Sequence, residues 1–341
     1  MNKNGKAGVL FYQRNADFEK FFDEIKDIGL DYVVTVKNVV ENTNFCETAQ
    51  KHKIPFYIDF PVFYNRDFLQ KKPEYYAITD KGHHATESWS HFVCPSRNDY
   101  FDMKLQELAD IVRNFSPSGI YLDFIRFFAF WEFIFENTNI NSIPDTCYCP
   151  KCLNSFMDYS GINLPSEKTD ILEISGYIRN THINEWTDWK TSLISEKVKK
   201  IRNTIKRINK DIFLASHVIP WKKDDFNGAL ENVVGQSVEK MSEHLDYISP
   251  MLYSPMLGRT TIWTESVLKE FSERKSANCG LIATIQGNKC YDEPDVSKEE
   301  FEKTVKTALN VPSDGFMIFN WKGIENDTQK KVILKNILNS N

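Results

Sequence analysis

The chain has 341 residues, of which 41% are hydrophobic and 13% aromatic, so it contains ample apolar material for a large core. The formal net charge of −5 at pH 7 gives no general basic field, which argues against nucleic acid or an anionic membrane surface as the main partner. No apolar run is long enough to cross a bilayer, and residues 1–8 contain no hydrophobic signal core, so the sequence predicts a soluble chain without an export signal.

Apolar segments of strand length alternate with amphipathic segments of helical period, which is typical of β–α units around a parallel sheet. In chain order, the predicted strands are Gly8–Gln13, Tyr32–Lys37, Pro55–Phe60, Gly119–Phe127, Ile212–His217, Tyr247–Tyr253, Gly280–Gln286 and Gly315–Trp321. The predicted helices are Asp17–Ile28, Thr43–His52, Tyr100–Asn114, Ile183–Ile208, Ser237–His244, Thr264–Lys275, Ser297–Leu309 and Thr328–Leu338.

Eight strands that alternate with helices predict an α/β fold, a (β/α)8 TIM barrel, formed as a single domain by residues 1–341. A doubly wound open sheet is the alternative, but no G-x-G-x-x-G follows the first strand. Long insertions follow the third strand, at about residues 62–97, and the fourth, at about 128–173. In a barrel both lie on the C-terminal face, where active sites are built.

Polar side chains stand at or near the end of each predicted strand, where they would line the mouth of the barrel. They are Gln13, Lys37, Asp59, Asp123 with Arg126, His217, Tyr253, Gln286, and Asn320 with Trp321. We expect Arg126 to neutralise Asp123 and to lower the pKa of its carboxyl group, which leaves a carboxylate suited to act as a nucleophile or to stabilise a cationic transition state.

Cleavage of a glycosidic bond needs a second carboxyl group, at about 5–5.5 Å for retention or about 6.5–9.5 Å for inversion of the anomeric centre. Asp59 is the first candidate for the proton donor, because a strand adjacent to that of Asp123 fixes its position. The alternatives in the loops are Glu132, Glu136, Asp224, Asp225 and Glu265.

Aromatic residues fall at or just beyond the strand ends: Tyr12, Trp89, Phe128, Trp131, Trp221, Tyr253 and Trp321. Sugar rings stack on such side chains, although core packing is the alternative for each of them. Trp221 and Trp321 are the preferred platforms. The predicted substrate-binding set is Tyr12, Gln13, Lys37, Trp89, His217, Trp221, Tyr253, Gln286, Asn320 and Trp321.

Three of the seven cysteines crowd into the segment Cys147-Tyr-Cys149-Pro-Lys-Cys152. Three thiolates at this spacing could bind a structural Zn²⁺ ion with a fourth ligand from elsewhere, or two of them could form a disulfide. No second C-x-x-C follows, so free or partly paired thiols are the competing interpretation. The sequence predicts no cofactor and no catalytic metal.

Three segments carry a resemblance to a known group: Gly119–Phe127 (GIYLDFIRF), Asp246–Tyr253 (DYISPMLY) and Asp314–Trp321 (DGFMIFNW). They resemble the glycosyl-hydrolase-like (β/α)8 barrels of bacteria, which are related in fold to the α-amylase and α-galactosidase type barrels. The resemblance covers residues 7–325 and implies that Asp123 is the catalytic carboxylate. Many glycosidase barrels present an acid at the end of a later strand, whereas the last three strands here end in Tyr253, Gln286 and Trp321.

The sequence therefore predicts a glycoside hydrolase that acts on an oligo- or polysaccharide, with Asp123, Asp59 and Arg126 as the catalytic group. If no acid donates the proton, the barrel binds glycans without cutting them. A metal-dependent carbohydrate deacetylase is the other alternative, with His83, His84, His217 and Asp59 as ligands, although no H-x-x-E-H or H-x-H pattern is present. The sequence makes no prediction of compartment or oligomeric state.

Overall fold

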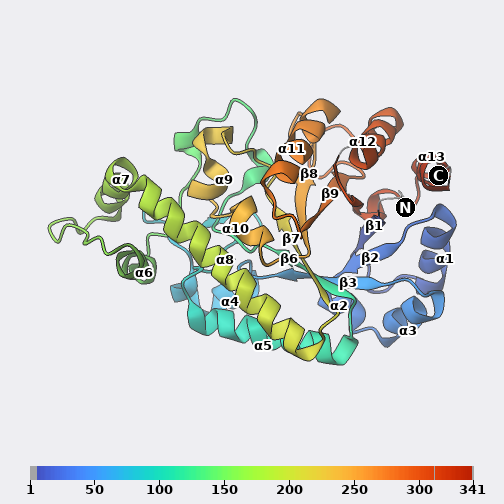
Figure 1. Cartoon of the computed structure of the whole chain (residues 1–341), viewed down its shortest axis with the longest axis horizontal. Helices are drawn as coiled ribbons and strands as arrows, with labels where there is room; N and C mark the ends of the chain where they lie inside the picture. The colour runs from blue at the N-terminus through green and yellow to red at the C-terminus, as the bar shows by residue number, and fades with distance from the viewer. Residues whose placement is uncertain (1–5, 311, 340–341) are drawn as a thin grey trace.

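The computed structural model describes residues 6–310 and 312–339. At its centre, eight parallel strands form a closed barrel (Figure 1). These strands are β1 (Lys6–Phe11), β2 (Tyr32–Thr35), β3 (Phe56–Pro61), β6 (Gly119–Asp123), β7 (Phe213–Val218), β8 (Tyr247–Leu252), β9 (Gly280–Gln286) and β10 (Gly315–Phe319). They follow one another around the ring in chain order, and β10 pairs with β1 to close it. The predicted (β/α)8 barrel is confirmed.

Helices surround the strands: α1 (Phe18–Ile28), α2 (Lys37–Val40), α3 (Thr43–His52), α5 (Asn98–Phe115), α8 (Ile183–Ile208), α10 (Val238–Ser242), α11 (Thr261–Arg274), α12 (Lys298–Asn310) and α13 (Thr328–Asn339). Helix α1 shows why these segments are helical. Its apolar residues recur at helical spacing and are buried on one face. The Asp17 carboxylate accepts a hydrogen bond from the Lys20 N–H at 3.1 Å, and Gly29, with a φ of 93°, ends the helix.

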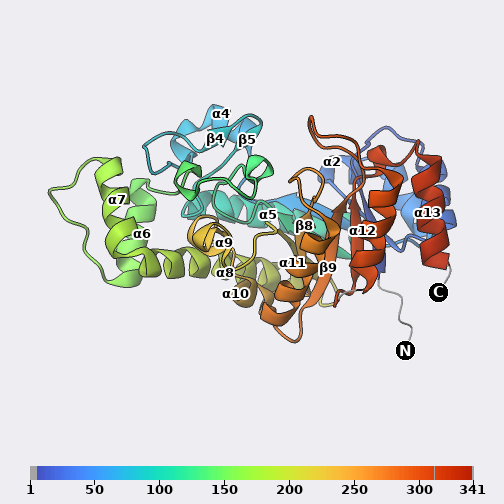
Figure 2. The same ribbon diagram turned by 90° about the horizontal axis from the view of Figure 1, so that it is seen from above.

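The two segments predicted as insertions carry small elements of their own. After β3 come α4 (Arg66–Lys71), the 3-10 turn η1 (Pro73–Tyr75) and the hairpin of β4 (Thr86–Glu87) and β5 (Ser90–His91). After β6 come the turns η2 (Trp131–Phe133) and η3 (Ile140–Ser142), then α6 (Pro150–Ser160) and α7 (Ile171–Thr181). Figures 1 and 2 show α6 and α7 projecting beyond the barrel at one end of α8. The loop after β7 adds η4 (Asp225–Asn227) and α9 (Ala229–Asn232), and η5 (Trp321–Gly323) follows β10.

Tyrosine rings fill the N-terminal end of the barrel. Three of them lie opposite a glycine on the neighbouring strand; the pairs are Tyr32 with Gly8, Tyr57 with Gly119 and Tyr247 with Gly280. A Cβ atom on these glycines would come within 2.2, 2.6 and 2.4 Å of the respective ring. Each glycine therefore supplies the space that a tyrosine ring occupies, and this end of the barrel is a packed core.

Among the described residues, no helix has both the length and the apolar character needed to span a membrane.

Candidate active site

The alternation of side chains along the strands places several polar groups above the tyrosine layer. Residues two apart on a strand face the same side. Tyr57, Tyr121 and Ala215 belong to the cluster of side chains inside the barrel. Asp59, Asp123 and His217 follow each of them by two positions in β3, β6 and β7, so their side chains face the same interior at its C-terminal end.

Strand β6 ends at Asp123 and not at Phe127, where the apolar run predicted its end. Phe124 has a φ of 50°, a left-handed conformation that is unfavourable for a bulky residue, and this turns the chain out of the sheet. The Phe124 N–H donates to the Asp123 carboxylate at 2.8 Å. The Phe124 ring packs against Tyr64 and Phe92, with ring centres 5.0 and 5.7 Å apart. The surrounding packing thus holds a strained turn directly beside Asp123.

A cavity of about 320 Å³, here called the central cavity, opens at the mouth of the barrel. Two acids line it, the half-buried Asp123 and the buried Glu132 of η2. Much of the remaining wall is aromatic and consists of Trp89, Phe124, Trp131, Tyr253, Tyr291 and Phe319. Asn288, Lys289 and Cys290, from the loop after β9, complete one side together with Tyr291. The sequence prediction missed this loop, because its residues lie beyond the end of the strand.

Glu132 has the electrostatic properties of a proton donor. Burial, opposed by the charge of Arg126 and reinforced by that of Asp123, raises the pKa of Glu132 to about 7. Its side chain is buried, and Oε2 has no hydrogen-bond partner among the described residues. A substantial fraction of Glu132 is therefore protonated near neutral pH, and the proton is not committed to another group of the protein.

Asp59 lies deeper in the barrel than Asp123 and does not line the central cavity. Its Oδ2 atom accepts a hydrogen bond from the Tyr12 hydroxyl at 3.0 Å, and the Nε2 atom of His217 is 3.9 Å from its Oδ1 atom. Burial and the charge of Asp123 raise the pKa of Asp59 well above its usual value, while the Tyr12 hydrogen bond opposes the shift. Burial lowers the pKa of His217, against the effect of Asp123. Asp59, Tyr12 and His217 thus form one buried group below the cavity floor, directly under Asp123.

Arg126 does not form the expected ion pair with Asp123. Its Nη1 donates to the carbonyl groups of Phe127 and Ala129 at 3.1 and 3.0 Å, and the guanidinium lies over the Phe92 ring at 4.7 Å. Burial lowers the pKa of Arg126 to about 10, opposed first by Glu132 and then by Asp123. The turn after β6 directs the guanidinium into a set of carbonyl groups, so its charge acts more strongly on Glu132 than on Asp123.

Several of the residues predicted to bind substrate do lie around the central cavity. Trp89, Tyr253 and Asn320 line it, and Tyr12 contacts Asp59 below it. Gln286 has another role, because its side chain holds the loop after β9. Its Nε2 donates to the Asn288 carbonyl at 2.9 Å and to Glu293 at 2.8 Å, and its Oε1 accepts from the Met256 N–H at 3.0 Å.

The two preferred aromatic platforms are not at the mouth. Trp321 is 3% exposed and packs edge-on against Phe21 of α1, with ring centres 5.1 Å apart. Trp221 is also 3% exposed and packs against Phe226 at 5.3 Å. Both are core side chains, because the chain has left the strand before either residue and turns it towards the surrounding helices and loops.

Gln13 and Lys37 also lie away from the central cavity. Tyr12 faces the barrel interior, so the next residue faces outwards, and Gln13 donates to Glu325 at 2.6 Å. Strand β2 ends at Thr35 and Lys37 begins α2, where it forms an exposed ion pair with Glu107 at 3.4 Å.

The other loop acids proposed as proton donors lie outside the central cavity. Glu136, Asp224 and Asp225 line a separate groove of about 520 Å³, and Glu136 forms an ion pair with Arg259 there at 2.7 Å. Glu265 pairs with Lys269 on the surface of α11 at 2.6 Å.

The ligand set of a metal-dependent deacetylase is not assembled. His83 and His84 are exposed in the first insertion, where the His84 ring stacks on Tyr76 with centres 4.3 Å apart. Neither belongs with His217 and Asp59 to a group of side chains that could share a metal ion; among residues 6–310 and 312–339, only four cysteines form such a group. This arrangement contradicts the deacetylase hypothesis.

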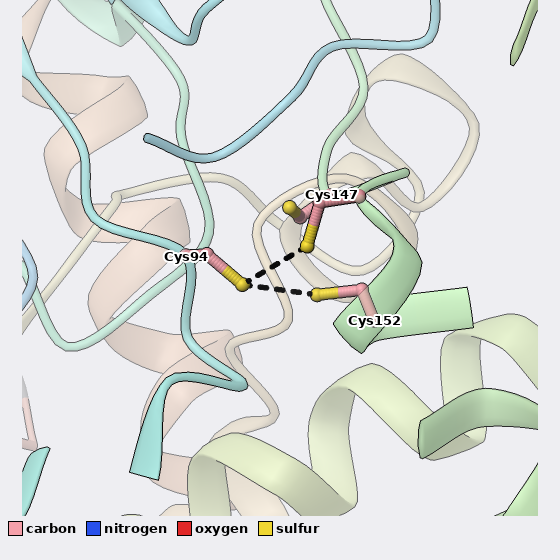
Figure 3. Close-up of side chains that lie close together, drawn as sticks. Cys94, Cys147 and Cys152 are labelled. Carbon is pink, nitrogen blue, oxygen red and sulfur yellow. Dashed lines mark hydrogen bonds between the residues drawn. The ribbon is translucent and has the colours of Figure 1, made fainter. Parts of the chain in front are cut away.

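Those four cysteines are Cys94, Cys147, Cys149 and Cys152, and their sulfur atoms all lie within 4.8 Å of one another. Figure 3 shows Cys94, Cys147 and Cys152 directed towards the same point. Cys94 comes from the first insertion and completes a group of four with the three cysteines of the C-x-C-P-x-C segment. All seven cysteines are free thiols, so the structure contains no disulfide in this segment.

The sequence matches no protein-family model and no curated protein. Solved structures share the fold. The glycoside hydrolase domain of PgaB (BpsB) from Bordetella bronchiseptica aligns with a TM-score of 0.72 and 11% identity, over 98% of this chain and 99% of that domain. A β-galactosidase from Halorubrum lacusprofundi aligns with a TM-score of 0.71 and 12% identity, over 98% of this chain and 57% of its own. A β-galactosidase from Marinomonas ef1 aligns with a TM-score of 0.70 and 9% identity, over 98% of this chain and 59% of its own. The chain thus has the barrel fold of these proteins and spans little more than half the length of the two β-galactosidases.

Proposed function

We propose that the protein hydrolyses glycosidic bonds in an oligo- or polysaccharide, with Asp123 and Glu132 as the two catalytic carboxyl groups. The observation that carries this proposal is the pairing in one cavity of a half-buried carboxyl group with a buried one whose pKa is about 7. Glycosidases need one ionised and one protonated carboxyl group at the same pH, and different environments produce this difference.

The two acids have distinct roles in this mechanism. Glu132 donates its proton to the glycosidic oxygen as the bond to the anomeric carbon breaks. Asp123, at the end of β6, acts on the positive charge that develops at that carbon, either as the nucleophile or as the base that activates water. Asp59 is then a positioning residue and not the donor, because it lies below the cavity floor and its Oδ2 is bonded to Tyr12.

The wall of the cavity suits a sugar. Tyr253 stacks on Phe319 with ring centres 5.0 Å apart, and Trp131 lies 5.7 Å from Tyr253. Aromatic faces of this kind bind the apolar C–H faces of sugar rings. A second hollow of about 570 Å³, lined in part by Phe130 and Phe133, shares Tyr291 with the central cavity. The position of this hollow beside the central cavity supports a substrate of more than one sugar unit.

The structural neighbours support the same class of reaction by fold-level analogy, since their names describe glycoside hydrolases and β-galactosidases.

A panel of aryl glycosides, oligosaccharides and polysaccharides tests the proposal by comparing wild type with Asp123→Asn. We expect turnover by the wild-type protein and a loss of kcat of about 10³-fold or more in the variant, since removal of an essential catalytic group has effects of this size. Asp158→Asn, an exposed residue of α6, is the control and should keep wild-type activity. Glycan binding by the wild-type protein without turnover of any substrate would instead favour the non-catalytic glycan-binding barrel.

A further inference from the structure

The four clustered cysteines come from both insertions at the mouth of the barrel. Cys94 follows the β4–β5 hairpin of the first insertion. Cys147 and Cys149 end the loop that leaves β6, and Cys152 lies in the first turn of α6. All four are buried, with exposures from 0 to 6%. Two segments distant in the sequence therefore direct four thiols towards one point in the interior.

The spacing of the sulfur atoms fits a single ion. Cys94 Sγ lies 3.4 Å from the sulfur atoms of both Cys149 and Cys152, and all four sulfur atoms lie within 4.8 Å of one another. Four thiolates at a Zn–S distance of about 2.3 Å form a tetrahedron with edges of about 3.8 Å. A cluster of two or four iron atoms would hold its cysteine ligands further apart, so the geometry selects a mononuclear tetrahedral site.

Positive charge is available to balance such a site. A Zn²⁺ ion with four thiolates carries a net charge of −2, which is costly to bury without compensation. Helix α8 contributes two buried lysines, Lys190 and Lys197, with exposures of 0 and 2%. Burial lowers the pKa of both ammonium groups. At Lys190 this is opposed first by Asp145 and then by Cys147 and Cys152, and at Lys197 first by Asp102 and then by Cys94 and Cys152.

The partners of the two lysines hold the ammonium groups in place. Lys190 Nζ donates to Asp145 and to the carbonyl groups of Asn232 and Val233 at 3.0 and 2.9 Å. Lys197 Nζ donates to the neutral side chain of Asn98 at 2.7 Å and forms no ion pair with a carboxylate in the described part of the chain. Lys197 therefore brings a buried positive charge without a paired carboxylate to the side of the cysteines.

Two further contacts surround the sulfur atoms. The Ile78 N–H donates to Cys147 Sγ at 3.3 Å, and Ser96 Oγ lies 3.2 Å from Cys152 Sγ. Backbone N–H groups directed at sulfur stabilise thiolates in metal sites and orient them. Both contacts come from the first insertion and reach ligands in the second.

We propose that Cys94, Cys147, Cys149 and Cys152 bind one structural Zn²⁺ ion that joins the two insertions at the mouth of the barrel, with the buried Lys197 offsetting part of its negative charge. Four protein ligands leave no position open for substrate, so the ion takes no part in chemistry. Its effect is mechanical: Cys94 fixes the segment that follows Trp89, and Cys147 fixes the far end of the loop that carries Glu132. The proposal does not depend on the proposed function.

Metal analysis of the full chain, purified under reducing conditions without chelator, is the first test. We expect about one zinc per chain in wild type and a loss of most of it in Cys149→Ser and Cys94→Ser, because each removes one of four ligands. Cys279→Ser is the matched control, since Cys279 is a buried cysteine outside the cluster, and it should keep the zinc. The assignment would be overturned if the wild-type protein neither contains nor takes up zinc. It would also be overturned if the protein contains one iron per chain in place of zinc.

A second measurement avoids variants that fail to fold. Zinc is stripped from the wild-type protein with a chelator, and limited proteolysis maps the cleavage sites before and after zinc is restored. We expect segments 62–97 and 128–173 both to become sensitive to the protease when zinc is removed, and both to regain protection when it is restored. The barrel strands should resist cleavage throughout. Protection of both segments in the stripped protein, or sensitivity in only one of them, contradicts a shared metal anchor.

Lys197→Met then tests the charge balance in the same assay. The Lys197→Met variant should bind zinc about tenfold or more weakly with the four ligands unchanged, because the negative charge of the buried thiolate site loses a compensating positive charge. Lys199→Met, an exposed lysine on the same helix, should leave affinity unchanged.

Discussion

The two ends of the barrel are built on opposite principles. At the N-terminal end, tyrosine rings fill the space left by Gly8, Gly119 and Gly280, and the interior is closely packed. At the C-terminal end, polar side chains are buried without full hydrogen bonding. Strand β6 shows both, since it begins at Gly119 in the packed layer and ends at Asp123 in the mouth. The difference indicates that the lower layer serves stability, while the upper layer carries the groups of the proposed active site.

The cost of the upper layer can be traced to particular atoms. Asp59 Oδ1, Glu132 Oε2 and His217 Nδ1 are buried and have no hydrogen-bond partner among the described residues. Each such group costs about 1–3 kcal/mol of stability. Phe124 adds a strained backbone conformation at the same place. Substitutions at the two ends should therefore have opposite effects on stability and activity.

Beyond Asp123→Asn, the largest effect is expected for Glu132→Gln. Loss of the proton donor should lower kcat by about 10²–10⁴-fold on natural glycosides. Aryl glycosides with a good leaving group need less protonation and should be affected much less. Kinetics on both substrate types measure the difference. An equal loss on both types would mean that Glu132 does not donate the proton.

The same variant should be more stable than wild type at alkaline pH. The pKa of Glu132 is raised from 4.5 to about 7 in the folded chain, so wild type loses stability as pH rises through this window. Glutamine does not titrate. The difference in free energy of unfolding between the variant and wild type should be absent below about pH 4.5. It should reach about 1–3 kcal/mol in favour of the variant above pH 7. Urea unfolding at pH 4.5 and 8 measures it, and a variant less stable at pH 8 would contradict the burial argument.

Gly119→Ala tests the other end of the same strand. Its Cβ atom would lie 2.6 Å from the Tyr57 ring and 2.8 Å from the Phe213 carbonyl oxygen. Overpacking of this kind costs about 1–3 kcal/mol. Thermal unfolding should show the loss, while kcat of the folded fraction stays at the wild-type value. Gly176→Ala, in helix α7 where nothing lies within 4 Å of the new Cβ atom, is the control and should not destabilise the protein.

The pH profile of wild type sharpens the comparison further. Because Glu132 must be protonated to act as the proposed donor, kcat/KM should fall above about pH 7, by about tenfold per pH unit at the limit. The residual activity of Glu132→Gln should lack this alkaline limb. A limb retained in the variant would assign the titration to another group.

The smallest effect is expected for Tyr12→Phe. The variant removes the hydrogen bond to Asp59 and leaves a buried carboxyl group with one partner fewer, which costs about 1 kcal/mol. The pKa of Asp59 should rise further, because that hydrogen bond opposes the shift. NMR titration of the carboxyl groups and urea unfolding check the two expectations. A fall in the Asp59 pKa would show that Tyr12 does not stabilise the carboxylate.

The fold was predictable because each strand is a short apolar run bounded by turn residues, and each run recurs at the spacing of β–α units. The inward orientation of Asp59, Asp123 and His217 at the C-terminal end of the barrel also follows from sequence, since alternation along a strand places them. The side chains of Tyr12 and Gln13, which directly follow the end of β1, still alternate: Tyr12 reaches Asp59 and Gln13 reaches Glu325. The alternation is lost at Trp221 and Trp321, three and two residues beyond the ends of β7 and β10.

The loops were harder to predict because contacts distant in the sequence decide their burial. Glu132 has no local signal that distinguishes it from Glu136; its raised pKa arises from burial in the folded mouth. Arg126 appeared able to reach Asp123 because only three positions separate them, but the turn at Phe124 redirects it. Cys94 was one of four scattered cysteines until the fold placed it beside Cys147.

The proposed zinc anchor between the two insertions has an evolutionary consequence. A tetrahedral ligand set that loses one member loses most of its affinity, so selection acts on both segments as a unit. In descendants and ancestors of this gene, Cys94 and the C-x-C-P-x-C segment should be gained and lost together, and a shortening of one insertion should be accompanied by a shortening of the other.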